Sequence, residues 1–168
     1  MRELLHDAER VATLLTQRRE TIAVAESSAG GLIAAALIAV PGASTFCRGG
    51  VVLYTRSAWH ALREFSDDLF AGIRPATEPH ALVRARVARD RFDATWGLGE
   101  TGATGPTGNR YGDPAGHACF GVSGAIDRAI TLRTASTDRY ANMHAFAKAA
   151  LEFLADCLAQ ADKGGTHA

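Results

Sequence analysis

Lysine is nearly absent from this sequence of 168 residues. Of its 18 basic residues, all except Lys148 and Lys163 are arginines. Because arginine keeps its proton in ordinary protein environments, it is a poor general base. Chemistry that requires a neutral amine therefore has two candidate residues, and both lie near the C-terminus.

The sequence also lacks net charge, paired cysteines and a long apolar run. Its 18 basic residues balance 18 acidic ones, whereas nucleic-acid binding usually requires a basic surplus. Cys47, Cys119 and Cys157 form no CxxC pair and indicate reduced thiols. The N-terminus does not resemble a signal peptide, and the apolar run over residues 32–40 is too short to span a bilayer. We therefore expect a cytoplasmic protein with neither a nucleic-acid nor a membrane partner.

Alternating helical and strand patterns predict one α/β domain over residues 1–162, a three-layer α/β/α sandwich with a mixed sheet. The hydrophobic fraction of 47% is sufficient for its core. Helices are predicted near residues 4–15, 32–40, 57–65, 77–91 and 138–162, and strands near 21–25, 49–55, 94–98, 117–122 and 129–134. The arginines of the fourth helix are interpreted as a solvated face, and residues 163–168 as a disordered tail.

Three segments between these elements have compositions typical of ligand sites. Residues 25–31 (Ala-Glu-Ser-Ser-Ala-Gly-Gly) begin a helix, where an anion is favoured; a serine cap with closely packed glycines explains them equally well. Ser44 lies in a loop before the strand that ends near Tyr54, although turn and packing roles are simpler explanations. Residues 99–116 contain six glycines and two prolines, which would let a ligand approach the backbone.

Several standard motifs are excluded. The sequence contains neither the GxSxG elbow of α/β-hydrolases nor a phosphate-binding P-loop. Residues 97–102 match GxGxxG, but Gly105-Pro106 prevents the helix that a dinucleotide fingerprint requires. The aspartate, histidine and cysteine within residues 113–119 lack metal-ligand spacing. We expect no metal and no cofactor.

Taken in order, these segments resemble the CinA C-terminal domain family, the nicotinamide-nucleotide amidohydrolases, over roughly residues 5–160. Residues 25–31 match the first family motif, Ala-Glu-Ser-x-x-Gly-Gly. The second motif consists of Pro/Ala-Gly-x-Ser, matched by residues 41–44, and Gly-Gly-x-Val-x-Tyr, matched by residues 49–54. The third consists of Thr/Ser-Gly-x-x-Gly-Pro, matched by residues 101–106, and Pro-x-Gly, matched by residues 114–116, and the fourth, Gly/Ser-x-Asp-Arg, is matched by residues 136–139.

The resemblance implies a stand-alone, metal-free serine amidohydrolase without a cofactor. Its expected small-molecule partner is nicotinamide mononucleotide (NMN) or a related nicotinamide amide, which it converts to the acid and ammonia. It also implies a homo-oligomer. The implied catalytic residues are Ser44 as the nucleophile, with Ser27 and Tyr54 as hydroxyls that relay protons or hold the carboxamide. Arg139 is implied to bind the phosphate of the substrate. The other implied substrate-binding residues are Ser28, Gly30, Gly31, Thr101 and Gly102.

One position departs from the family pattern. Relatives typically read Tyr-Ser-Asn-x-Ala-Lys, whereas this chain reads Tyr54-Thr-Arg-Ser-Ala-Trp59. A desolvated lysine beside a serine is a reasonable activating base, but tryptophan accepts no proton. Either His60, Tyr54 or His117 replaces the base, or Lys148 reaches the site, or the protein binds a nucleotide without efficient hydrolysis. The family name also suggests a competence-linked interaction protein, although neutral charge argues against DNA contact.

Overall fold

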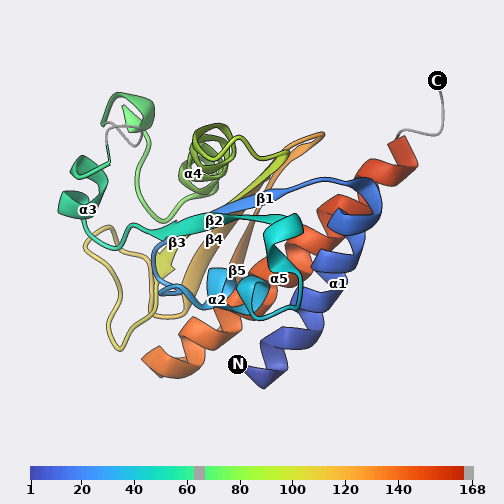
Figure 1. Cartoon of the computed structure of the whole chain (residues 1–168). Helices are drawn as coiled ribbons and strands as arrows, with labels where there is room; N and C mark the ends of the chain where they lie inside the picture. The colour runs from blue at the N-terminus through green and yellow to red at the C-terminus, as the bar shows by residue number, and fades with distance from the viewer. Residues whose placement is uncertain (63–66, 165–168) are drawn as a thin grey trace.

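The computed structural model describes residues 1–62 and 67–164, built around a five-stranded sheet. The strand order is β2 (Cys47–Val52), β1 (Ile22–Glu26), β3 (Trp96–Ala103), β4 (His117–Ser123) and β5 (Asp127–Arg133). β1 is parallel to both β2 and β3, whereas β4 is antiparallel to β3 and β5. Helices cover both faces of this sheet (Figure 1). The predicted three-layer α/β/α sandwich with a mixed sheet is therefore confirmed.

One face of the sheet is covered by α1 (Arg2–Arg18), α2 (Leu32–Ile38) and α5 (Arg139–Gly164) (Figure 1). The apolar faces of these helices bury the larger hydrophobic core against the strands. α5 continues two residues into the predicted disordered tail, and residues 165–168 lie outside the described residues.

The opposite face is covered by α4 (Glu78–Arg91), which lies unusually close to the sheet. A Cβ atom added at Gly99 would lie 2.1 Å from the carbonyl oxygen of Ala81, and one added at Gly121 would lie 2.5 Å from the carbonyl carbon of the same residue. Only glycine permits so close an approach of helix to strand. The approach holds the first half of α4 beside the carboxyl ends of β1 and β2.

The structure corrects several predicted boundaries. β3 continues through Ala103, so the first residues of the predicted glycine-rich loop are strand. Gly99 packs against α4, and Gly102 packs against β4 and Ser28. β2 begins at Cys47 and ends at Val52, after the short 3-10 helix η1 (Ala43–Thr45). α3 (Arg56–His60) is shorter than the predicted helix over 57–65, part of which lies outside the described residues; η3 (Asp67–Phe70) follows that gap.

Candidate functional site

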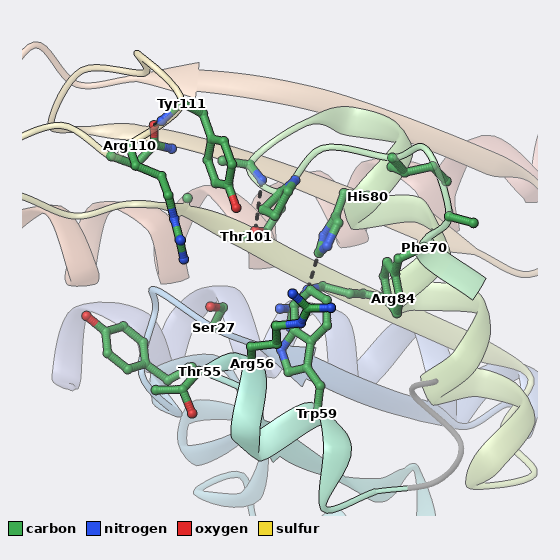
Figure 2. Close-up of a pocket in the computed structure, with 17 residues that line it drawn as sticks. Ser27, Thr55, Arg56, Trp59, Phe70, His80, Arg84, Thr101, Arg110 and Tyr111 are labelled. Carbon is green, nitrogen blue, oxygen red and sulfur yellow. Dashed lines mark hydrogen bonds between the residues drawn. The ribbon is translucent and has the colours of Figure 1, made fainter. Parts of the chain in front are cut away.

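A cavity of about 780 Å³ lies beyond the carboxyl ends of β1 and β2, next to α4 (Figure 2). This volume is in the range of small-molecule sites. Four of the residues implied by the resemblance line it, namely Ser27, Tyr54, Thr101 and Gly102, together with Trp59 at the altered family position. The cavity is also lined by residues that no sequence pattern had indicated, namely Arg56, Phe70, His80, Arg84, Arg110 and Tyr111. The lining contains three arginines and no acidic side chain from the described residues, so the wall is cationic.

The loop that carries Ser27 is held by the buried carboxylate of Glu100. This carboxylate accepts hydrogen bonds from the backbone N–H groups of Ser27, at 2.8 Å, and Ala29, at 2.9 Å. It also accepts a bond from the hydroxyl of Ser28, which is buried. Three bonds to one charged acceptor fix the loop firmly. Ser27 is therefore presented to the cavity on a rigid backbone.

A second buried carboxylate, that of Glu26, holds the start of α2. It accepts backbone hydrogen bonds from Gly31 at 3.0 Å, Ile33 at 3.1 Å and Ala34 at 2.7 Å. Burial raises the pKa of Glu26 to about 7, and the neighbouring charge of Glu100 acts in the same direction. The anion that the sequence led us to expect at this helix start is therefore a side chain of the protein itself.

These two carboxylates bind two residues of the predicted substrate site. The hydroxyl of Ser28 is bound to Glu100, and the N–H of Gly31 is bound to Glu26. Gly30 packs against α5, where an added Cβ would lie 2.5 Å from Cε of Met143. None of the three lines the cavity. The alternative interpretation of capping and close packing accounts for the contacts of these residues, and their binding of substrate stays a prediction.

Ser44 lies far from the cavity, in the exposed turn η1. It precedes β2, whereas Ser27 follows β1. Because these strands are parallel, with Ile22 beside Cys47 at one end, residues before β2 and residues after β1 lie at opposite ends of the sheet. The prediction that Ser44 shares a site with Ser27 and acts as the nucleophile is therefore wrong.

Trp59 occupies the altered family position and forms part of the cavity wall. Its indole Nε1 donates a hydrogen bond to the carbonyl oxygen of Leu53 at 3.0 Å. Its ring lies 4.8 Å from that of Phe70 and 4.9 Å from that of His80, centre to centre. The guanidinium carbon of Arg84 lies 4.5 Å from the centre of the indole. Residue 59 therefore supplies no base to the cavity, and the guanidinium of Arg84 from α4 lies against its indole ring (Figure 2).

Arg84 is buried, although its helix was predicted to present its arginines to solvent. Its guanidinium donates to the carbonyl oxygens of Glu26 at 3.3 Å and Leu53 at 3.2 Å, and its Nε to Nδ1 of His80 at 3.4 Å. Burial lowers the pKa of Arg84 to about 10. No carboxylate among the described residues forms a salt bridge with it. The solvated-face interpretation is wrong here, because the glycines of β3 let α4 press this side chain against the sheet.

His80 is fully buried one helical turn before Arg84. Since Nε of Arg84 can only donate, Nδ1 of His80 accepts, and the imidazole proton is on Nε2. Burial and the charge of Arg84 lower the pKa of His80 to about 3, so the ring is neutral near pH 7. Nε2 has no hydrogen-bond partner among the described residues. The sequence signal was the His–Arg spacing of four, which places both side chains on one helix face.

The remaining site residues lie around Tyr54 and Thr101. Arg139 donates one hydrogen bond to the Tyr54 hydroxyl at 2.8 Å and another to the carbonyl oxygen of Gly105 at 2.7 Å. Thr101 accepts a bond from the backbone N–H of Ala76 at 3.2 Å. Arg139 therefore lies behind Tyr54 and holds its hydroxyl, and contact between Arg139 and a phosphate stays a prediction.

Of the four candidate replacement bases, His60, Tyr54, His117 and Lys148, Tyr54 is the one that lines the cavity. His60 is exposed at the end of α3. His117 is buried on β4, with Nε2 2.9 Å from a backbone carbonyl oxygen. Lys148 forms a 2.9 Å salt bridge with Asp7 across α5 and α1, on the other face of the sheet. The suggestion that Lys148 reaches the site is therefore wrong.

Neither 1–62 nor 67–164 contains a helix long and apolar enough to cross a membrane. The same residues contain no group of three or more histidine, cysteine, aspartate or glutamate side chains placed to hold a metal ion. Cys47, Cys119 and Cys157 are free thiols.

Known proteins match both the sequence and the fold. A family described as the CinA C-terminal domain matches residues 5–158. The chain is 40% identical to a CinA-like protein of Prochlorococcus marinus (strain MIT 9313) over 68% of this chain and 27% of that protein. It is 37% identical to a CinA-like protein of Gloeobacter violaceus over 73% of this chain and 29% of that protein. The chain thus spans less than a third of the length of these relatives.

Solved structures share the fold over nearly the whole chain. A competence-damaged protein (CinA) superfamily protein from Klebsiella pneumoniae 700603 matches with a TM-score of 0.85 and 25% identity, covering 94% of this chain and 98% of that one. The competence/damage inducible protein CihA from Agrobacterium tumefaciens matches with a TM-score of 0.80 and 27% identity, covering 92% and 94%.

Proposed function

Because the chain belongs to the CinA C-terminal domain family, we propose that it is an amidohydrolase with Ser27 as its nucleophile. Its substrate is NMN or a related nicotinamide amide, which it converts to the carboxylic acid and ammonia. The observation that carries this proposal is the position of Ser27, on a rigid loop in a cavity whose wall is cationic.

The wall of the cavity matches the parts of a nucleotide. Arg110 lines it and supplies a charge for a phosphate, to which a guanidinium binds well. Figure 2 shows Arg110 and Tyr111 at one side, with Trp59, Phe70 and His80 grouped at the other. A ligand with a phosphate at one end and an aromatic carboxamide at the other fits this arrangement.

The reaction has two steps. The Ser27 oxygen adds to the carboxamide carbon, the C–N bond breaks, and the departing nitrogen takes up the serine proton and leaves as ammonia. Water then cleaves the resulting ester, which gives the acid and restores the serine hydroxyl. Tyr54, held by Arg139, relays the proton. The cation of Arg84, bonded to the carbonyl group that precedes Ser27, favours negative charge on the reacting oxygen.

A second candidate function is nucleotide binding with little turnover. It is favoured by Trp59, which accepts no proton, and by the neighbouring Arg84 and His80, which both present N–H groups. The loss of a general base typically costs about 10²–10⁴-fold in rate.

Incubation of the purified protein with NMN tests both candidates. Ammonia and the acid are measured over hours, with the Ser27→Ala variant as background. We expect product above this background. Tight NMN binding in calorimetry without product would favour the second candidate, and absence of both binding and product would reject the two together.

A further inference from the structure

The inner wall of the cavity contains two donors that form no salt bridge with a described carboxylate. His80 has an Nε2–H group that no described residue accepts, and Arg84 feels the charge of Glu100 without forming a salt bridge with it. Buried polar groups normally have hydrogen-bond partners, so the N–H group of His80 lacks the partner that a ligand oxygen would supply. We infer that His80 and Arg84 form a subsite for ligand oxygen atoms that binds a carboxylate in preference to a carboxamide. The inference rests on the proposed function for the aromatic ring that carries this group.

The donor on His80 is held in a fixed position. Its ring packs against Trp59 and Phe70, at 4.9 and 4.6 Å between centres, which limits its rotation. Its Nδ1 is occupied by Arg84, so the free N–H can only be the one on Nε2. A neutral imidazole in this tautomer donates a hydrogen bond and cannot remove a proton from Ser27. The ring therefore recognises an acceptor atom rather than activating the nucleophile.

The cation of Arg84 determines which acceptor is preferred. Its guanidinium bonds to the carbonyl oxygen of Glu26, the residue directly before Ser27, and is shielded from solvent. A carboxamide next to Ser27 therefore has its oxygen beside this charge. Hydrolysis replaces the carboxamide with a carboxylate, which carries a full negative charge in the same place. Charged hydrogen bonds are about twice as strong as neutral ones, so the acid binds more tightly than the amide.

This preference has a consequence for turnover. A site that holds the acid more tightly than the amide releases its product slowly and is inhibited as the acid accumulates. The same preference would let the protein bind the acid selectively even if hydrolysis is weak. The subsite thus has a role under either of the two candidate functions.

Nicotinate and nicotinamide form the decisive pair of probes, because they differ only in the carboxylate and the carboxamide. Titration is followed through the imidazole ¹⁵N and Nε2–H resonances of His80. We expect the free protein to show the Nε2–H tautomer, nicotinate to shift these resonances, and its dissociation constant to lie at least about tenfold below that of nicotinamide. Equal dissociation constants, an Nδ1–H tautomer, or no shift with either probe would overturn the inference.

The variant His80→Phe keeps an aromatic ring and removes the donor, and Phe92→Leu, in the same apolar cluster but outside the cavity lining, is its packing control. We expect the nicotinate preference to fall below about threefold in His80→Phe and to persist in Phe92→Leu; persistence in both would overturn the role of His80. If His80→Phe does not fold, the wild-type titration decides alone. Nicotinate preference without NMN hydrolysis would reject the proposed activity only, whereas hydrolysis without preference would reject this inference only.

Discussion

The guanidinium carbon of Arg84 lies 4.5 Å from the centre of the Trp59 indole, and this contact couples the two positions. Trp59 removes a proton acceptor from the place where relatives typically carry lysine, and Arg84 brings a permanent cation to the same place from α4. A desolvated cation–π contact of this kind contributes about 2 kcal/mol. The effect of a substitution at residue 59 therefore depends on residue 84.

Restoring lysine alone should destabilise the fold for this reason. In Trp59→Lys an amine would face the buried guanidinium in place of the indole, so we expect a loss of about 2–3 kcal/mol in the free energy of unfolding. The guanidinium disfavours the charged amine, so the lysine can act as a neutral base, and we expect NMN hydrolysis about 10²–10⁴-fold faster than in the wild type. In Trp59→Lys combined with Arg84→Met we expect stability to recover and the gain in rate to fall, because the amine keeps its proton and the cation that favours charge on the reacting oxygen is gone.

Ammonia release and urea unfolding of both single variants and the double variant give a complete cycle. Arg84→Met serves as the control, since it removes the cation without adding a base. Additive effects of the two substitutions on stability and rate would show that the positions are not coupled.

The raised pKa of Glu26 predicts that the free energy of unfolding depends on pH. Burial raises the pKa of this carboxyl to about 7 from 4.5, so between these values the folded protein binds more protons than the unfolded chain. Below pH 4.5 Glu26 makes its full contribution to the free energy of unfolding, and this contribution is lost as the pH rises through 7. From pH 5 to 6.5 we expect the wild type to lose about 2 kcal/mol relative to Glu26→Gln, at ~1.4 kcal/mol per pH unit.

Urea unfolding of both proteins across this range measures the difference. Taking Glu26→Gln as the reference cancels other titrating groups, including His80, whose lowered pKa makes stability rise with pH up to about 6.5. A difference that is constant or rises between pH 5 and 6.5 would contradict the assignment.

Arg110 is the lining arginine that we expect to contact a phosphate. It lies beside Tyr111, with its guanidinium carbon 5.5 Å from the ring centre. We expect Arg110→Gln to weaken NMN binding about tenfold in calorimetry and to leave nicotinamide riboside, which has no phosphate, unaffected. Arg86→Gln is the control, because Arg86 pairs with Asp127 at 2.7 Å and does not line the cavity. Equal weakening of both ligands would place the phosphate elsewhere.

The layers of the fold followed from hydrophobic periodicity, and the main error came from glycine. Glycines in residues 99–116 were interpreted as a loop open to a ligand, but Gly99 is part of β3 and lets α4 lie against the sheet. Composition does not distinguish backbone freedom from the absence of a side chain. The same close packing buries Arg84. The His–Arg spacing of four places this side chain on one helix face with His80 but does not show that the face is buried.

The site was partly predictable for a topological reason. Tyr54 and Ser27 follow parallel strands, so they meet at the carboxyl ends of those strands, where open α/β sheets usually bind ligands. Ser44 precedes its strand, and the same rule places it at the other end. The role of Glu100 depended on backbone N–H groups far away in the sequence, at Ser27 and Ala29, which sequence spacing does not reveal.

The central claim is that the nucleophile is Ser27, and the two serines offer a direct comparison. NMN-dependent ammonia release is measured for the wild type, Ser27→Ala and Ser44→Ala, with urea unfolding to show that all three are folded. The account predicts that Ser27→Ala loses the activity and that Ser44→Ala, altered in an exposed turn, retains the wild-type rate. Activity that survives in Ser27→Ala and disappears in Ser44→Ala would contradict it.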